Sequence, residues 1–277
     1  MLYTIQTTLD FQYLVIDRIR IRYIDTNSKA NPILLIHGLG GSIESWIKNI
    51  YTISKDFRVI AVDLPGFGFS DKPKINYTIA FYKSFIINFI KCLKIRSPVS
   101  IVGSSLGGHI AAEVAINHPE LVFKLILISP AGALPFSFKG TPALRNYMKV
   151  LKARSMQEIK KALSSIDNNP CDEDSVKAFY EKLSTAGARN AFMSAYKGSA
   201  KAPRLCRRLN VIKGAMLLIW GKEDRIIPAK FIKPFLSVKN CRIILLENCG
   251  HRPNIDKPLL FNNIVTDFIQ EKEDIVN

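Results

Sequence analysis

The sequence contains no apolar run that approaches the roughly 18–20 residues required for a membrane-spanning helix. Its longest apolar runs, such as 33–36 and 215–220, are short and are followed by His or Gly. The first residues show no basic-then-apolar signal pattern, and Asp10 and Asp17 lie among them. We therefore expect no membrane span and take a cytoplasmic protein as the default.

Paired cysteines are also absent. The chain has 5 cysteines, an odd number, and no two stand in a C-x-x-C arrangement. This pattern excludes a disulfide framework and a cysteine-based zinc site. We expect no metal site and interpret all the thiols as buried or incidental. They are Cys92, Cys171, Cys206, Cys241 and Cys249.

Acidic residues are scarce relative to basic ones, with 23 against 39, which gives a formal net charge of +16. Such an excess is compatible with a nucleic acid, an anionic membrane surface or an acidic substrate. The charges are scattered, however, and no zinc-finger, basic-zipper or RNA-binding signature is present. We interpret them as a solvated surface and expect no nucleic-acid partner. The tightest cluster is Arg204, Arg207, Arg208 and Lys213.

Short apolar runs separated by helix-length segments dominate the remaining sequence, after a predicted hairpin of strands at 11–16 and 19–24. Strands that are apolar on both faces are typical of a parallel sheet covered by helices, so the pattern predicts a doubly wound α/β fold. The predicted buried strands are 33–36, 59–62, 99–102, 125–128, 216–220 and 243–246. The predicted helices are 43–53, 78–93, 106–118, 228–238 and 257–270.

The interval between the strands at 125–128 and 216–220 breaks this alternation. It contains only helical patterns, and Leu134-Pro135 and Ala202-Pro203 mark hinges at its ends. We predict a core domain of residues 1–133 and 206–277 with a helical cap insertion at 134–205. The cap is expected at the carboxyl edge of the sheet, where ligands of such folds bind. Its predicted helices are 142–153, 156–164, 174–183 and 188–196.

The strongest chemical signal is the segment Gly103-Ser104-Ser105-Leu106-Gly107-Gly108, between a predicted strand and a predicted helix. G-x-S-x-G in this context is typical of a nucleophile elbow, a turn so tight that its flanking positions must be small. Gly103 and Gly107 flank Ser105, whereas Val102 and Leu106 would flank Ser104. We therefore predict Ser105 as the nucleophile.

A serine hydroxyl requires a base, and the chain has 4 histidines. His109 lies on the helix that follows Ser105 and points away from the turn, and His118 ends that helix. His37 ends the first buried strand and is expected to support its loop. Only His251 follows the last strand, on a loop at the carboxyl edge, so we predict it as the base.

The acid that orients the histidine is expected on another loop at the same edge. Asp224 follows the strand at 216–220, and Glu223 is its nearest rival. Asp224 is preferred because 225–228 leads directly from it into the next helix. The order Ser105, Asp224, His251 is the one that this type of triad requires.

Backbone N–H groups that stabilise the developing oxyanion complete the predicted site. One donor is expected to be the N–H of Leu106, the residue after the nucleophile. The second is expected from Leu39 in the glycine-rich loop that follows the first buried strand, where His37 and Gly38 support the motif.

These motifs give the chain a clear resemblance to the α/β-hydrolase superfamily. It resembles the branch with small helical caps that includes esterases, lactonases, meta-cleavage-product hydrolases and epoxide hydrolases. The resemblance implies an α/β-hydrolase fold and structural roles for Asp63 and the Pro65-Gly66 turn. It rests on His37–Ser42, Asp63–Pro73, Gly103–Gly108, Gly221–Pro228 and Gly250–Pro258.

Departures from the family patterns narrow the reaction. Ser105 argues against haloalkane dehalogenases and epoxide hydrolases, which use aspartate at the elbow. Meta-cleavage-product hydrolases usually have tryptophan after the catalytic histidine, where this chain has Arg252, and an arginine in the cap. Four cap arginines are candidates for that second position: Arg145, Arg154, Arg189 and Arg204.

We therefore expect a serine hydrolase that cleaves carboxylic esters through an acyl-enzyme, without a metal or organic cofactor. A lactonase, a C–C hydrolase or an acyltransferase with the same triad remains open, as does a non-catalytic binding protein of this fold. The expected partner is a small-molecule ester or lactone, and the chain is expected as a monomer or homodimer. Aromatic cap residues are expected mainly to pack the cap, with some lining a pocket.

Overall fold

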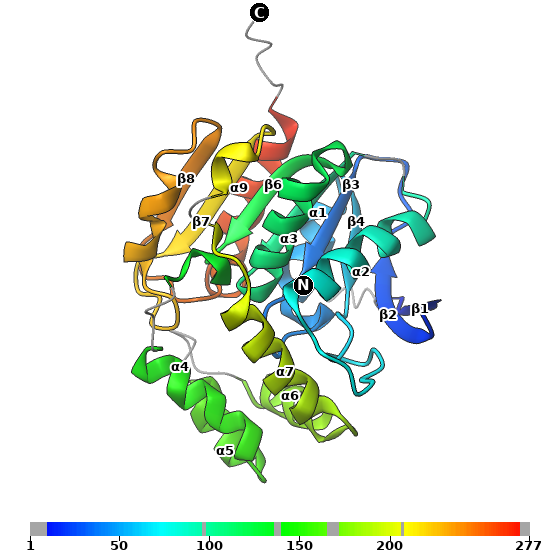
Figure 1. The fold of residues 1–277 in the computed structure, drawn as a ribbon, viewed down its shortest axis with the longest axis vertical. Helices are drawn as coiled ribbons and strands as arrows, with labels where there is room; N and C mark the ends of the chain where they lie inside the picture. Colours follow the sequence, from blue (N-terminus) through cyan, green and yellow to red (C-terminus); the bar gives the residue numbers. More distant parts are fainter. Residues whose placement is uncertain (1–9, 96–97, 136–139, 165–171, 206–207, 272–277) are drawn as a thin grey trace, which may run out of the picture.

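The computed structural model describes residues 10–95, 98–135, 140–164, 172–205 and 208–271. These residues form one sheet in the order β1-β2-β4-β3-β5-β6-β7-β8 (Figure 1). The β1–β2 and β2–β4 pairs are antiparallel and the other pairs are parallel, which confirms the predicted sheet with its amino-terminal hairpin. The strands are β1 (Gln12–Ile16), β2 (Ile19–Asp25), β3 (Pro32–Ile36), β4 (Arg58–Val62), β5 (Val99–Ser104), β6 (Val122–Ile128), β7 (Met216–Gly221) and β8 (Cys241–Leu246).

Helices cover both faces of the sheet, which explains why its central strands are apolar throughout. In β3, Ile33 and Leu35 pack into the cluster on one face, and Leu34 and Ile36 into the cluster on the other. This alternation follows from the two-residue period of a strand. The first face is covered by α1 (Ile47–Ile53) and α9 (Pro258–Gln270), the second by α2 (Ile79–Cys92) and α3 (Leu106–Asn117).

Two predicted core helices differ from the structure. The segment 43–53 begins as a 3₁₀ turn at Ile43–Trp46 and becomes helix α1 only afterwards. The segment 228–238 forms the 3₁₀-helix Ala229–Phe235 rather than an α-helix. Pro234 lies inside this segment and has no N–H to donate, so it opposes a regular α-helix there. A short helix, α8 (Pro253–Asp256), also precedes α9.

In the described part of the interval between β6 and β7 the chain forms four α-helices, which Figure 1 shows gathered at one end of the molecule. They are α4 (Pro142–Tyr147), α5 (Met156–Leu163), α6 (Glu173–Ser184) and α7 (Ala188–Lys201). The segment predicted as one helix over 142–153 ends its α-helical part at Tyr147 and continues as 3₁₀ turns. We use the name cap for residues 134–205. Buried cap residues such as Phe192 and Val150 belong to the same apolar cluster as the core.

Within the described ranges, no helix combines the length and apolar character needed to cross a membrane. Three cysteines are free thiols: Cys92 is exposed, Cys241 is half-buried and Cys249 is buried. Burial raises the pKa of the Cys241 thiol to about 12. Cys171, Cys206 and Arg207 lie outside the described residues, as do Phe136 and Phe138 of the cap.

The turn between β5 and α3 brings backbone segments into unusually close contact. A Cβ atom on Gly103 would lie 2.3 Å from the carbonyl oxygen of Gly107. A Cβ atom on Gly107 would lie 2.3 Å from the carbonyl oxygen of Ile36 at the end of β3. Both contacts are with backbone, which has no room to move aside. Because β4 lies on the other side of β3 from β5, this turn lies where the strand order reverses, the place where ligands of such sheets bind.

These contacts predict that Gly107→Ala destabilises the protein by about 3 kcal/mol or more, at the upper end of the range for overpacking. Chemical denaturation measures the change in the free energy of unfolding. Gly214→Ala is the matched control, because a Cβ atom there meets nothing closer than 3.4 Å. Equal stabilities for the two variants would contradict the steric explanation of the turn.

Candidate active site

Ser105 has a strained backbone between β5 and α3. Its φ of 53° and ψ of −110° lie in a region that side chains other than glycine rarely adopt. The strain is held in place, because the N–H of Ser105 donates to the carbonyl of Ile128 at 2.8 Å. The Ser105 carbonyl accepts from the N–H groups of His109 and Ala131. Ser104 is the last residue of β5, so only Ser105 occupies the turn itself.

His251 and Asp224 are joined by a hydrogen bond between Nδ1 and Oδ2 of 2.8 Å. The Asp224 side chain is fully buried, and its other oxygen accepts the N–H groups of Ile226 at 2.9 Å and Ile227 at 2.8 Å. These bonds fix the carboxylate, which in turn fixes the imidazole. With Nδ1 donating to Asp224, Nε2 is left as the nitrogen that accepts a proton. His251 and Ser105 line the same cavity of about 260 Å³.

Glu223, the rival of Asp224, has a different partner. Its Oε2 accepts the N–H of Cys249 at 2.9 Å, two residues before His251. Glu223 therefore ties together the two loops that carry Asp224 and His251, and it is Asp224 that contacts the imidazole.

The glycine-rich loop after β3 passes directly beside the elbow. A Cβ atom on Gly38 would lie 3.2 Å from the Cβ of Ser105. Leu39 and Leu106, the predicted sources of the oxyanion donors, line a second and smaller cavity of about 100 Å³ together with Ser105. The sequence-predicted residues Ser105, Leu39 and Leu106 are thus brought together.

His37 supports this loop through hydrogen bonds of both ring nitrogens. Its Nδ1 donates to the carbonyl of Gly38 at 2.8 Å, and its Nε2 accepts the N–H of Leu64 at 3.0 Å. A carbonyl can only accept and an N–H can only donate, so these partners assign the tautomer. Burial lowers the pKa of His37, which keeps the ring neutral. Both ring nitrogens are used by the backbone, as a supporting role requires.

Two histidines lie away from the candidate site. His109 Nε2 donates to the carbonyl of Pro203 at 3.2 Å and so links α3 to the second cap hinge. Burial lowers the pKa of His109 to about 4. His118 is partly exposed, and its Nδ1 lies 3.2 Å from Glu120 Oε1.

The cap contacts the glycine-rich loop through Tyr147, which no sequence pattern distinguishes from the other cap aromatics. The hydroxyl of Tyr147 donates to the carbonyl of Leu39 at 2.7 Å. Gly40 follows with a φ of +73°, and a Cβ atom there would clash with Tyr147 and Phe192. The cap therefore holds the loop that carries the candidate oxyanion donor.

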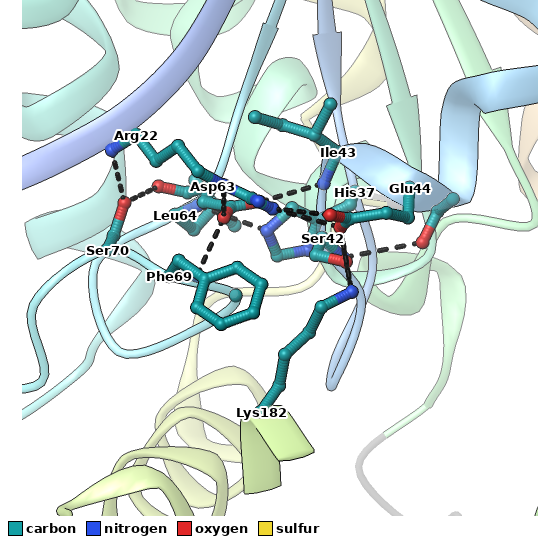
Figure 2. A network of polar contacts seen from close by, with 12 residues as sticks. Arg22, His37, Ser42, Ile43, Glu44, Asp63, Leu64, Phe69, Ser70 and Lys182 are labelled. Carbon is teal, nitrogen blue, oxygen red and sulfur yellow. Dashed lines mark hydrogen bonds and ion pairs between the residues drawn. The ribbon is translucent and has the colours of Figure 1, made fainter. Parts of the chain in front are cut away.

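A buried ionic network centred on Asp63 lies behind the same loop (Figure 2). Asp63 Oδ2 accepts from Arg22 Nε at 2.6 Å and from the N–H of Phe69 at 2.8 Å. Its Oδ1 accepts the N–H of Ile43 at 2.8 Å. Both charged side chains are nearly or fully buried. Asp63 therefore fixes the segment that leads from the glycine-rich loop into α1, in keeping with the structural role that its motif implied.

The network continues from Arg22 to the cap. Arg22 Nη2 donates to both oxygens of Glu44 at 2.9 Å, and Lys182 of α6 donates to Glu44 Oε2 at 2.7 Å (Figure 2). Lys182 also donates to the hydroxyl of Ser42 at 2.9 Å. Burial alone would raise the pKa of the Glu44 carboxyl, but Lys182, Ser42 and Arg22 outweigh it and lower that pKa to about 2. Sequence reasoning missed Arg22, Glu44 and Lys182, because nothing local marks them as partners.

Asp63→Asn is expected to destabilise the protein by about 3 kcal/mol, because it leaves the buried Arg22 guanidinium without its closest carboxylate. Glu271→Gln is a matched control that removes the exposed Arg242–Glu271 pair and is expected to cost less than about 1 kcal/mol. Denaturant unfolding curves at neutral pH measure both. If Asp63→Asn lowers the free energy of unfolding no more than the control does, the buried network does not contribute to stability.

A sequence profile described as the alpha/beta hydrolase fold matches residues 31–258. A 2-hydroxy-6-oxo-6-(2'-aminophenyl)hexa-2,4-dienoic acid hydrolase of Metapseudomonas resinovorans is 29% identical over 267 residues, which cover 93% of this chain and 90% of that protein. A chain of the solved structure of a bacterial membrane phospholipase A is 26% identical with a TM-score of 0.82, covering 94% of this chain and 86% of that chain.

A meta-cleavage product hydrolase from Pseudomonas fluorescens shares the fold, with a TM-score of 0.82 at 24% identity over 93% of this chain and 97% of that chain. The profile match spans most of the chain and includes β3 to β8 together with the elbow and the loops of Asp224 and His251. These three proteins are named as hydrolases or as a phospholipase. The two solved structures superimpose on 94% and 93% of this chain. The chain is a hydrolase that belongs to the α/β-hydrolase family.

Proposed function

We propose that this chain cleaves carboxylic esters of small molecules through an acyl-enzyme, with Ser105 as nucleophile, His251 as base and Asp224 as the orienting acid. The observation that carries the proposal is the His251–Asp224 hydrogen bond of 2.8 Å beside a cavity that Ser105 also lines. A serine held in a strained turn at the same cavity as a buried His–Asp pair meets the requirements of nucleophilic catalysis.

In the first step, His251 Nε2 takes the proton from Ser105 Oγ as that oxygen attacks the ester carbonyl carbon. The carbonyl oxygen becomes an oxyanion, which the N–H groups of Leu39 and Leu106 stabilise. Asp224 remains ionised and stabilises the imidazolium that forms. The tetrahedral intermediate collapses when its bond to the alkoxy oxygen breaks and His251 passes its proton to that oxygen.

In the second step, water replaces the alcohol beside His251. His251 takes a proton from this water, whose oxygen attacks the acyl carbon, and the proton then returns to Ser105 Oγ as the acid leaves. We propose that the cap, residues 134–205, covers this reaction and shapes the cavities. Tyr147 and Lys182, which contact the core loops, would hold it in place.

A second candidate function is hydrolysis of a C–C bond by the same triad. The 29% identity to a hydrolase named for a 2-hydroxy-6-oxohexadienoic acid favours it. Ester cleavage is favoured by the similarity to the membrane phospholipase A, whose name denotes an esterase. Arg252 in place of tryptophan after His251 also weighs against C–C cleavage.

The positions of the four cap arginines show which of them could serve as the cap arginine that meta-cleavage-product hydrolases usually have. Arg189 donates to the carbonyls of Val150, Leu151 and Ala153 and so fastens α7 to the neighbouring turn. Arg145 and Arg154 are exposed. Of the four, Arg204 is the one that lines either cavity at Ser105 within the described residues.

Hydrolysis of p-nitrophenyl esters from C2 to C12 tests the proposal. Ser105→Ala is expected to lower kcat by about 10⁴-fold or more, because removing a triad member removes covalent catalysis. Ser104→Ala is the control and is expected to retain most of the activity. No turnover of any ester by the wild type would contradict ester cleavage.

An assay with a 2-hydroxy-6-oxohexa-2,4-dienoate distinguishes the two candidate reactions. Cleavage of its C–C bond is followed as a loss of the substrate's absorbance. We expect kcat/KM for the best ester to exceed that for this substrate. The opposite order, abolished in both cases by Ser105→Ala, would make C–C hydrolysis the principal activity. Hydrolysis of lactones in the same assay format distinguishes a lactonase from an esterase for open-chain esters.

A further inference from the structure

Ser105 lines two cavities, and they differ in size and in charge. The larger, of about 260 Å³, is lined by His251 and by charged groups of both signs from the core and the cap. The smaller, of about 100 Å³, is mainly apolar. Its apolar walls include Leu39, Leu106, Leu134, Leu144, Ile226 and Ile227. Among the described residues that line it, the one charged side chain is Arg204.

The chemistry assigns one half of the substrate to each cavity. His251 must reach the leaving oxygen to protonate it, and His251 lines the larger cavity. Leu106, whose N–H faces the carbonyl oxygen in the proposed mechanism, lines the smaller one. With the alcohol half in the larger cavity beside His251, the smaller cavity, which Ser105 also lines, is the space left for the acyl chain on the other side of the carbonyl carbon. An acyl chain in that space is short, because the smaller cavity has less than half the volume of the larger.

Arg204 lines the smaller cavity, and the residues before and after it in the sequence are packed against the core. It is half-buried, its Nε atom is buried, and its Nη2 donates to the carbonyl of Ala200 at 2.8 Å. The residue before it, Pro203, accepts a hydrogen bond from His109 of α3 at 3.2 Å. Leu205, the residue after it, is fully buried. These contacts fix the backbone of Arg204 against the core, so its side chain starts from a fixed position at the wall of the smaller cavity.

We infer that the acyl half of the substrate ends in a carboxylate and that Arg204 binds it, so that the preferred substrates are monoesters of short dicarboxylic acids. This inference rests on the proposed ester hydrolysis. A guanidinium matches a carboxylate with paired donors, and apolar walls strengthen that attraction by excluding water. The same walls accommodate the methylene groups between the ester carbonyl and the carboxylate.

The test compares p-nitrophenyl monoesters of glutaric and adipic acid with the neutral p-nitrophenyl pentanoate and hexanoate, after subtraction of the buffer rate. The measured quantity is the ratio of kcat/KM for the anionic ester to that for the neutral ester of equal chain length. Wild type is expected to prefer the anionic esters. Arg204→Met is expected to lower the ratio by about 10- to 100-fold, the loss of a charge-assisted contact.

Arg145→Met is the matched control, because it removes the same charge from an exposed site on the cap. It is expected to leave the ratio unchanged. Arg204→Lys is expected to recover part of the preference, which a purely structural role for the side chain would not produce. Retained turnover of the neutral esters by Arg204→Met shows that this variant is folded.

Three results would overturn the inference. If wild type cleaves the neutral esters but not the anionic ones, or if Arg204→Met lowers both equally, then Arg204 does not bind a substrate carboxylate, while ester hydrolysis stands. If wild type cleaves no ester, both the inference and the proposed function fail. The neutral esters therefore separate the two kinds of failure.

Discussion

The candidate site depends on the close approach of α3 to the end of β3. Gly107 lies so near the carbonyl of Ile36 that any side chain there would occupy the space of the backbone. This approach places Ser105 in its strained conformation beside Gly38, and it brings the N-terminus of α3 next to the glycine-rich loop. One steric constraint thus positions the nucleophile and both candidate oxyanion donors on fixed backbone, as a preorganised site requires.

The loops around this centre are fastened by polar contacts that come from distant parts of the chain. Asp63 holds the segment after the glycine-rich loop, and Asp224 holds His251. The cap adds Tyr147 on the carbonyl of Leu39 and Lys182 on Glu44. Because the cap bonds directly to the loop that carries Leu39, a displacement of the cap would also disturb the proposed oxyanion site. Substrate binding and catalysis are coupled through this loop in our account.

The parts of the molecule that could be predicted from the sequence are those in which the fold requires particular residue types at particular positions. Strands buried on both faces must be apolar throughout, and the elbow must have glycine at Gly103 and Gly107, so both leave clear patterns. The Asp224–His251 bond was also expected, although the roles of these residues remain our proposal. The segment 228–238 was predicted wrongly, because its apolar spacing fits a helix while Pro234 opposes one. Arg22, Glu44 and Lys182 could not be found, since they meet only through tertiary folding.

The central claim is that Ser105 is the residue acylated during turnover. Incubation with a fluorophosphonate, followed by fragmentation mass spectrometry of the peptide that contains Gly103–Gly108, locates the modified residue most directly. Our account predicts one adduct per chain, on Ser105, with labelling slowed strongly in Asp224→Asn because the imidazole loses its fixed tautomer. An adduct on Ser104, or no adduct on this peptide, would contradict the account.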